Sequence, residues 1–223
     1  MDFVVKSIQS YETYDWLKHK HYARRIPPIE FAFGLFDKNN VLNGVITYGT
    51  PVSSTLREIL DNQFKIYELN RLCVNDGLPK NTLSFFVAQS FKILPKPICL
   101  VSYADSSQNH HGYIYQATNW IYTGLSIPFK EWKIKGLEFM HHTTVHDLSR
   151  GQENRLKWLK NKFGENLIEV ERPRKHRYFY FLGSKQDIKK MKELFPYKSE
   201  PYPKGENKRY DSSHIPTVQT KLF

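Results

Sequence analysis

The side chains best suited to chemistry in this sequence lie within one stretch, residues 66–124. Two apolar runs in it, 66–74 and 98–104, are rich in Ile, Leu, Val, Tyr and Cys, as buried parallel strands are. Each run carries a polar cluster, and the two clusters are Glu68/Asn70/Arg71 and Ser102/Tyr103/Asp105. Neighbouring parallel strands would bring both clusters to one edge of a sheet, where α/β proteins hold ligands. The stretch therefore predicts a binding or catalytic cleft.

The segment that joins the two runs supplies a second binding feature. Asn81 or Thr82 follows Pro79 and can cap a helix, whose apolar residues then share one face. Strand, helix and strand form a βαβ unit, and the loop 75–81 leads into the helix N-terminus. The unpaired N–H groups of a helix N-terminus attract anions. We therefore expect a cofactor to bind at Gly77, Asn81 and Thr82.

The rest of the sequence predicts the elements that position these residues. In chain order they are a strand at 3–8, a helix from Ser10 to about Tyr22, a hairpin of strands 31–37 and 41–49, a helix at 151–163, an antiparallel strand pair at 166–171 and 177–183, and a basic helix at 185–195. We predict an α/β (α+β) fold whose mixed sheet has antiparallel N-terminal strands, a central βαβ unit and a C-terminal antiparallel strand pair. Residues 1–195 would form one domain, followed by a Pro-rich basic tail, 196–223, that is extended or disordered.

Composition narrows the class of partner. A formal charge of +11 in 223 residues favours a polyanion such as nucleic acid, although a merely soluble basic protein is the alternative. Cys73 and Cys99 are expected to be buried free thiols. No apolar run reaches the roughly 20 residues that span a bilayer, and the start lacks a signal-peptide pattern. We expect a cytoplasmic protein without a membrane segment, and the sequence carries no signal for its oligomeric state.

An antiparallel N-terminal half joined to a βαβ unit resembles the GNAT-type N-acyltransferases. This resemblance implies a single catalytic domain and an acyl-coenzyme A-like donor, whose pyrophosphate would lie at the loop before the central helix. The Gln/Arg-x-x-Gly-x-Gly/Ala loop usual in these enzymes is absent, and Gly77 is the loop's one glycine.

A closer resemblance is to the phage Mom-type DNA adenine-modification family, a GNAT-related group. It rests on motifs spread over residues 15–204: His21-Tyr22, ITYG around Tyr48, ELNRL (68–72), Pro79-x-Asn81-x-x-Ser84, SYAD (102–105), HGxIYQAxNW (111–120), RYFYFLG (177–183) and PYPK (201–204). It implies transfer of a carbamoylmethyl (methylcarbamoyl) group from a small-molecule donor to N6 of adenine in double-stranded DNA, which shields phage DNA from host restriction. It also implies bound iron in some members.

The resemblance gives candidate catalytic roles to residues of the motifs. Because the lone pair of adenine N6 is delocalised, an enzyme must orient this amine and remove a proton, and Asp105 is the candidate base. The alternative for Asp105 is a cap on the following loop. Tyr115 would protonate the leaving thiolate, or else pack against the sheet. Tyr48 joins the catalytic candidates through its motif.

Two further catalytic candidates, Ser84 and Arg71, would also bind the donor. Ser84 lies in the first turn of the central helix, where its hydroxyl can contact a phosphate or close the cap. Arg71 needs a partner if buried, and this partner is either a ligand anion or a carboxylate such as Glu68 or Asp105.

The candidate metal ligands are His21, Tyr22 and Asp105, since imidazole with oxygen ligands suits non-haem iron. A histidine at a helix C-terminus is also favoured in any protein. His142 and His146, spaced i, i+4, are a secondary candidate pair.

Contacts with DNA phosphates are expected from two basic groups of residues, which are Arg24, Arg25, Arg172, Arg174, Lys175 and Arg177. The alternatives to a DNA-modifying enzyme are an N-acyltransferase for a protein or small-molecule amine, and a non-catalytic DNA-binding protein.

Overall fold

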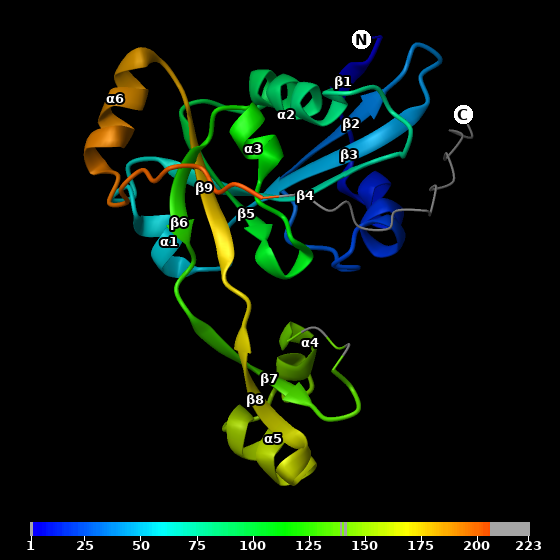
Figure 1. Ribbon diagram of the computed structural model, residues 1–223, viewed down its shortest axis with the longest axis vertical. Coiled ribbons are helices and arrows are strands. Elements are labelled where there is room, and N and C mark those ends of the chain that lie inside the picture. The colour runs from blue at the N-terminus through cyan, green and yellow to red at the C-terminus, as the bar shows by residue number, and fades with distance from the viewer. Residues whose placement is uncertain (1, 139, 141, 206–223) are drawn as a thin grey trace. The chain divides into compact units, whose positions relative to one another are not determined.

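A seven-stranded sheet organises most of the protein, seen here in a computed structural model that describes residues 2–138, 140 and 142–205. Its strand order is β1-β2-β3-β4-β5-β9-β6 (Figure 1). The strands are β1 (Val4–Ser7), β2 (Phe31–Phe36), β3 (Leu42–Gly49), β4 (Lys65–Val74), β5 (Ile98–Asp105), β6 (Ile121–Leu125) and β9 (Lys175–Leu182). The mixed α/β sheet predicted from the sequence is confirmed.

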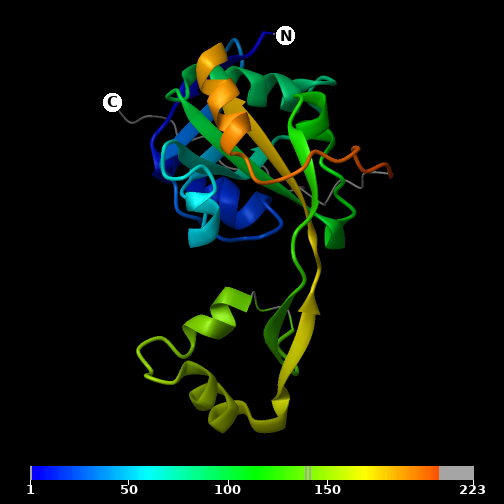
Figure 2. The ribbon, with the colours of Figure 1, turned by 90° about the vertical axis from the view of Figure 1, so that its left-hand side faces the viewer.

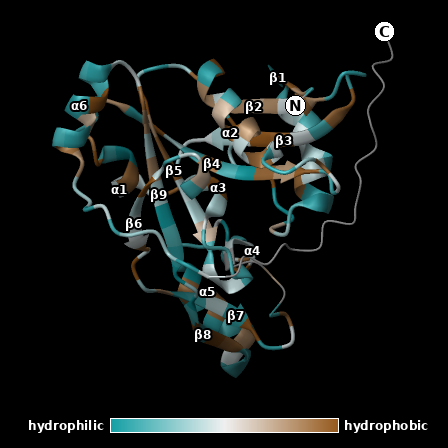
Figure 3. Cartoon of the chain, turned by 45° about the horizontal axis from the view of Figure 1, so that its top comes forward, coloured by the Kyte–Doolittle hydropathy of each residue, from teal (hydrophilic) through white to brown (hydrophobic). Residues whose placement is uncertain are grey.

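The first four strands pair antiparallel in sequence order. Strands β2 and β3 consist mainly of apolar residues (Figure 3) and join through the turn at 37–41, as the hairpin prediction required. The Asp37 carboxylate closes this turn by accepting hydrogen bonds from the N–H groups of Asn39 and Val41, each at 2.9 Å. Those backbone donors, Val41 first, lower the pKa of Asp37.

The predicted βαβ unit is also confirmed. Strands β4 and β5 pair in parallel, and α2 (Thr82–Ile93) connects them. Asn81 precedes α2 in the left-handed conformation, with φ of 68°, a conformation that Asn tolerates better than most residues.

Two hydrophobic cores cover the two faces of this sheet because successive strand residues point to opposite sides. On one face Phe86 and Val87 of α2 pack with Leu100. On the other, α1 (Ser54–Glu58) and α6 (Lys185–Leu194) pack against Cys99 and Val101 (Figure 1, Figure 2). Both cysteines, Cys73 and Cys99, are buried and free, as predicted.

The predicted C-terminal strand pair is wrong in its pairing. The second of the two strands is β9, which lies between β5 and β6 in the large sheet. The first is β8 (Leu167–Arg172), which pairs antiparallel with β7 (Phe129–Ile134). Strand periodicity predicts that both segments are extended, but the partner of each depends on the residues between 125 and 175.

Residues 125–175 form a second compact unit, which we call the insert unit. It contains the β7–β8 ribbon, α4 (His142–Asp147) and α5 (Arg155–Phe163). Ile134, Val145, Leu159 and Leu167 form its own small core. The larger unit comprises the described residues of 1–124 and 176–223. The prediction of one domain over residues 1–195 stays a prediction.

The start of the predicted tail is bonded to the larger unit. Tyr202 donates its hydroxyl proton to the Trp120 carbonyl at 2.6 Å, and the Glu200 N–H donates to the Tyr122 carbonyl at 2.9 Å. Residues 206–223 of the predicted tail lie outside the described residues. Within the described part of the chain, no helix is long and apolar enough to cross a membrane.

The first helix is less regular than predicted. It consists of a 3₁₀ turn, Ser10–Thr13, followed by a π-helical segment, Trp16–Lys20. The backbone then becomes extended at His21, which places His21 and Tyr22 after the helix end. The short helix α3 (Tyr113–Ala117) begins after Gly112, whose φ is +75°.

Replacing Gly112 with alanine should destabilise the protein strongly. A Cβ there would lie 2.5 Å from Cε2 of Tyr178, in a backbone conformation that already disfavours side chains. We expect Gly112→Ala to lower the free energy of unfolding by about 3 kcal/mol, combining overpacking with backbone strain. Gly77→Ala is the matched control, since Gly77 has φ +74° but no atom within 4 Å of its Cβ position, and about 1 kcal/mol is expected. Equal losses in urea unfolding would contradict the steric argument.

Candidate active site

Strands β4 and β5 stop pairing part-way along their length, and the candidate catalytic groups gather there. Paired residues end at Glu68 and Val101, although both strands continue. Beyond that point the Ser102 hydroxyl reaches the Leu69 carbonyl at 2.7 Å. The Ser102 side chain thus makes the hydrogen bond that a backbone N–H would make if β4 and β5 stayed paired. The polar groups of both strands therefore lie at one opening in the sheet.

Tyr115 of α3 lies at this opening, with its hydroxyl 2.7 Å from Oγ of Ser102. Because the Ser102 hydroxyl has one proton and the Leu69 carbonyl can only accept, Tyr115 can donate to Ser102 while Ser102 donates to Leu69. Burial raises the pKa of Tyr115 to about 12, the Ser102 hydrogen bond opposes this rise, and the Glu68 carboxylate adds to it. Tyr115 is therefore protonated at neutral pH and can act as a proton donor.

Tyr22 is the point on which the predicted residues converge. Burial raises its pKa above the ordinary value, and the nearby Asp105 and Tyr115 raise it further, while Arg71 lowers it. All three of these residues are therefore within electrostatic range of Tyr22. The ring stacks on His21 at 4.5 Å between centroids and meets the His110 ring edge-on at 5.9 Å.

Arg71 is largely buried and faces this cluster. Its Nη1 donates to the Asn70 carbonyl at 2.6 Å, and its Nε donates to the Arg25 carbonyl at 3.4 Å. Burial lowers its pKa, whereas Tyr22 and Glu68 raise it. The two carbonyls accept hydrogen bonds from some of the N–H groups of the guanidinium. A guanidinium is planar and presents its N–H groups as a fork, which binds carboxylates and phosphates.

Asp105 ends β5 and also caps the turn that follows. Its Oδ1 accepts hydrogen bonds from the Ser107 N–H at 3.0 Å and the Ser107 hydroxyl at 2.6 Å. The capping alternative is therefore correct, yet it is compatible with the other role, because the carboxylate is also near Tyr22. The cap holds Asp105 in a fixed orientation.

Tyr48 lies in the core and does not reach the opening. Its side chain is fully buried, and its hydroxyl lies 2.6 Å from Oγ of Ser90. Burial raises its pKa, and Tyr115 raises it further. In this position Tyr48 packs beneath Tyr115.

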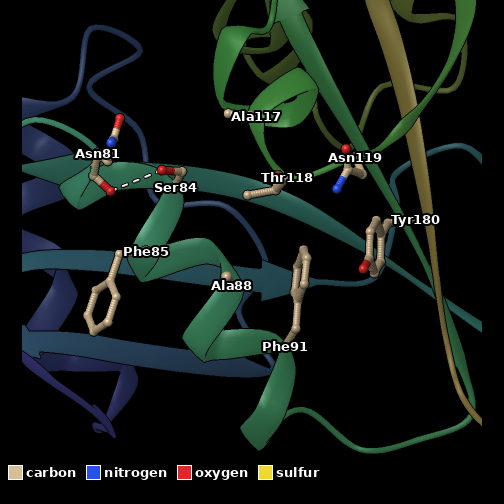
Figure 4. Close-up of a pocket in the computed structure, with 9 residues that line it drawn as sticks. All are labelled: Asn81, Ser84, Phe85, Ala88, Phe91, Ala117, Thr118, Asn119 and Tyr180. Atoms are coloured by element: carbon tan, nitrogen blue, oxygen red, sulfur yellow. Dashed lines mark hydrogen bonds between the residues drawn. The ribbon is translucent and has the colours of Figure 1, made fainter.

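A separate open pocket of about 560 Å³ lies between α2 and α3 (Figure 4). Its lining residues are Asn81, Ser84, Phe85, Ala88, Phe91, Ala117, Thr118, Asn119 and Tyr180. Ser84 donates its hydroxyl proton to the Asn81 carbonyl at 3.0 Å, and both residues border the pocket. The rings of Phe91 and Tyr180 stack at 4.6 Å, giving one wall an aromatic surface.

The other predicted cofactor residues lie in the loop before α2. Gly77 has no atom within 4 Å of its Cβ position, so the backbone there is open to approach. The Thr82 hydroxyl instead donates to the Pro79 carbonyl at 2.7 Å, and Thr82 is buried. Buried Lys20 ties the loop to the first helix through an ion pair with Asp76, at 3.6 Å.

The geometry at His21 does not fit the iron site that the family resemblance implies. Nδ1 of His21 accepts a hydrogen bond from the Ala23 N–H at 3.1 Å, so in the neutral ring the proton is on Nε2. Metal binding through Nε2 would move that proton to Nδ1, against the Ala23 N–H. Among the described residues, no three His, Cys, Asp or Glu side chains are grouped to hold a metal ion. The side chain of His142, from the secondary pair, lies outside the described residues.

The predicted DNA-binding arginines of the 172–177 run all have partners within the protein. They are Arg172 with Glu131 (3.8 Å), Arg174 with the carbonyls of Ser126 (2.6 Å) and Leu125 (3.3 Å), and Arg177 with Thr123 (2.9 Å) and over the Tyr197 ring (3.7 Å). The Lys175 N–H donates to the Ser126 hydroxyl. Their side chains contribute to packing as well as to charge.

Arg24 and Arg25 lie beside the catalytic cluster. Arg24 is exposed and has a φ of 44°, a left-handed conformation that its N–H stabilises by donating to the His21 carbonyl. The Arg25 carbonyl accepts from Arg71, which links this basic pair to the opening in the sheet.

Several residues of the site were missed by the sequence reasoning. His110 was given no role, and Thr118, Asn119 and Tyr180 of the pocket were not identified. Asn119 carried a signal in its neighbourhood, since the HGxIYQAxNW motif includes it. Tyr180 also lies in a motif, RYFYFLG, but its place in the pocket depends on the tertiary structure, which brings β9 to α2.

The fold and site define a mixed-sheet α/β protein with a cluster of partly buried tyrosine, arginine and aspartate side chains at the opening between two parallel strands. The model of the Mom protein family matches residues 2–204, and the chain belongs to this family. The chain is also similar to "Methylcarbamoylase mom" of Escherichia phage Mu, at 28% identity over 196 residues, covering 84% of this chain and 78% of that protein.

Solved structures with some likeness include two acetyltransferases. A ribosomal-protein-S5-alanine acetyltransferase from Vibrio fischeri has a TM-score of 0.45 and 9% identity, over 82% of this chain and 95% of that chain. A spermidine N-acetyltransferase from Vibrio cholerae has a TM-score of 0.43 and 8% identity, over 81% and 94% of the two chains.

Proposed function

We propose that this protein is a DNA-modifying transferase that attaches a carbamoylmethyl group to N6 of adenine in double-stranded DNA and so protects phage or prophage DNA from host restriction. Membership of the Mom family and the similarity to the methylcarbamoylase of phage Mu support this proposal. The observation that carries it is the gathering of Ser102, Asp105 and Tyr115 where the pairing of β4 and β5 ends, with the Tyr115 hydroxyl 2.7 Å from Oγ of Ser102. The enzyme would act in the cytoplasm of the host cell.

Adenine must leave the duplex to react, because N6 is paired inside the double helix. Aromatic rings commonly hold a flipped base by stacking. Tyr22, exposed over about a third of its surface (36%), and His110 offer such rings next to Asp105. The cluster therefore supports a pocket for the flipped adenine that has an aromatic wall. In this pocket the Asp105 carboxylate would be the general base.

The transfer itself needs one proton removed and one supplied. As N6 forms a bond to the methylene carbon of the carbamoylmethyl group, its proton passes to Asp105, and the bond from that carbon to the donor's leaving atom breaks with its electron pair. The donor must therefore carry its leaving atom on this methylene carbon and not on the carbonyl carbon, where a thioester carries it. Tyr115 gives its proton to the leaving atom. The position of its hydroxyl at the opening, 2.7 Å from Oγ of Ser102, supports this role, and the phenol is protonated at neutral pH.

The pocket between α2 and α3 is our proposed site for the donor. An acyl-coenzyme A-like molecule would place phosphates at the open backbone of Gly77 and at Ser84. Its base would lie on the Phe91 and Tyr180 rings, and Arg71 would bind an anionic or carbonyl oxygen nearer the reaction. The predicted donor-binding residues Asn81 and Ser84 support this assignment because both line the pocket.

Mass spectrometry of cellular DNA tests the proposal. The full chain is expressed in bacteria, and their genomic DNA is digested to nucleosides beside an empty-vector culture. We expect a new deoxyadenosine derivative whose mass corresponds to a carbamoylmethyl group, and DNA that resists endonucleases with adenine in their sites. An N6-acetyl product would differ by one N–H, so the same spectrum separates acetyl transfer from transfer of the proposed group. Unmodified deoxyadenosine, with the protein verified in the soluble extract, would contradict the proposal.

A further inference from the structure

In the insert unit, charged side chains of the β7–β8 ribbon pair with one another, whereas helix α5 carries positive charge. On the β7–β8 ribbon, basic side chains are paired with carboxylates: Lys130 with Glu169 (2.9 Å), Lys133 with Glu131 (3.4 Å) and Arg172 with Glu131 (3.8 Å). Near α4, Arg150 pairs with Asp147 at 3.0 Å. Three acidic residues of the unit, Glu131, Asp147 and Glu169, are therefore paired with basic residues outside α5.

Helix α5 has the sequence RLKWLKNKF, with four basic residues and no acidic one in nine positions. Leu159 fixes its orientation, because this side chain is buried in the core of the insert unit. The other side of the helix carries Lys157 and Lys160, three residues apart and both exposed, whereas exposed Lys162 projects from a different side of the helix, nearer to that of Leu159.

The lysines of α5 have no acidic partner among the described residues of the protein. Lys160 and Lys162 are instead held by aromatic rings: Nζ of Lys160 lies 5.9 Å from the Trp132 ring centroid, and Nζ of Lys162 lies 4.6 Å from that of Trp158. Such cation–π contacts restrain the long side chains and leave the ammonium groups in water. Restrained ammonium groups lose less conformational entropy when they bind an anion.

Arg155 differs from the three lysines. Its Nε donates to the Ser149 hydroxyl at 3.2 Å, and its Nη2 donates to the His146 carbonyl, so its guanidinium ties α5 to the preceding helix. The positive surface available to a partner is therefore formed by Lys157, Lys160 and Lys162, which we call the α5 lysine surface.

We propose that the α5 lysine surface binds the phosphodiester backbone of double-stranded DNA. The inference rests on the proposed function for its partner, and it goes further by assigning the contact to a part of the chain outside the catalytic cluster. Lysine acts on phosphate as a point charge, so this surface would hold DNA without reading its sequence. It differs from the 172–177 run, whose arginines are engaged within the protein.

The salt dependence of DNA binding by the full chain provides the test. Each lysine that neutralises a phosphate contributes about 0.9 to the slope of log K against log salt concentration. A triple variant, Lys157→Gln, Lys160→Gln and Lys162→Gln, should flatten that slope by about 3 for a 30-base-pair duplex and weaken binding about tenfold or more at ~0.1 M salt. The matched control is Lys185→Gln, Lys189→Gln and Lys192→Gln on α6, which removes the same charge from a helix that carries Asp187 and Glu193.

The outcomes separate this inference from the proposed function. A slope unchanged by the α5 triple variant, or changed equally by the α6 control, overturns the inference, even if the unaltered protein still modifies adenine in cells. A flattened slope in the α5 variant alone supports the inference, even if nucleoside analysis shows no modified adenine, a result that would defeat the proposed function instead. Circular dichroism and thermal unfolding of both variants verify that the insert unit remains folded.

Discussion

An Asp105→Asn variant is expected to lose adenine modification by about 10²-fold to 10⁴-fold, the usual contribution of a general base. Asparagine keeps the shape of the side chain and remains a good cap, so the hydrogen bond from the Ser107 N–H can persist. What the variant lacks is a carboxylate that can accept the proton of N6. The measurement is the fraction of modified deoxyadenosine at equal protein levels after a fixed induction time.

The control for this variant is Asp147→Asn. Asp147 pairs with exposed Arg150 in the insert unit, and the change removes the same charge without touching the opening between β4 and β5. Exposed pairs contribute about 0–1 kcal/mol, so modification should be nearly unchanged. DNA binding should be the same in both variants. If Asp105→Asn modifies DNA as fully as Asp147→Asn, Asp105 is only a cap.

Tyr115→Phe should reduce modification by about 10²-fold or more while leaving the fold intact. The change removes the hydroxyl that contacts Ser102, yet Ser102 keeps its bond to the Leu69 carbonyl, so no buried donor is left without an acceptor. We expect a stability cost of only about 1 kcal/mol, measured by urea unfolding. The rate at which modified deoxyadenosine appears after induction reports the loss of the proton donor.

The same helix offers a matched comparison, Tyr113→Phe. The Tyr113 hydroxyl donates to the Gly205 carbonyl at 2.7 Å, and its ring is exposed, so this variant loses an equivalent group outside the cluster. Modification should stay close to that of the unaltered protein. Equal rates in the two variants would show that the phenol of Tyr115 does not supply the proton, and that α3 serves only as a packing element.

Many of the strands and helices were predictable because they depend on local patterns, although β6, β7 and α4 were not predicted. The apolar runs of β2, β3, β4 and β5 and the apolar face of α2 each specify their element within a short window. The βαβ unit then follows, since a parallel pair joined by a helix has few alternatives. Its prediction already brought Ser102 and Asp105 close to Arg71.

The strand partners of the C-terminal half were not predictable in this way. Extended character gives no information on partners, and β8 and β9 were paired with each other because they are adjacent in sequence. The insert unit pairs β8 with β7 and leaves β9 for the large sheet. The pocket residue Tyr180 could not be foreseen for the same reason, since it reaches Phe91 only through this sheet order.

The sequence by itself determined the elements, the basic character and, through its motifs, the family with the residue types of the site. Only the tertiary structure decided which of those residues act together. It placed Tyr48 in the core, capped Asp105 beside Tyr22, bonded the arginines of the 172–177 run within the protein and left the α5 lysines unpaired among the described residues. The physical reason is that burial and charge pairing depend on contacts between residues far apart in the chain, whereas helix and strand formation depends mainly on near neighbours.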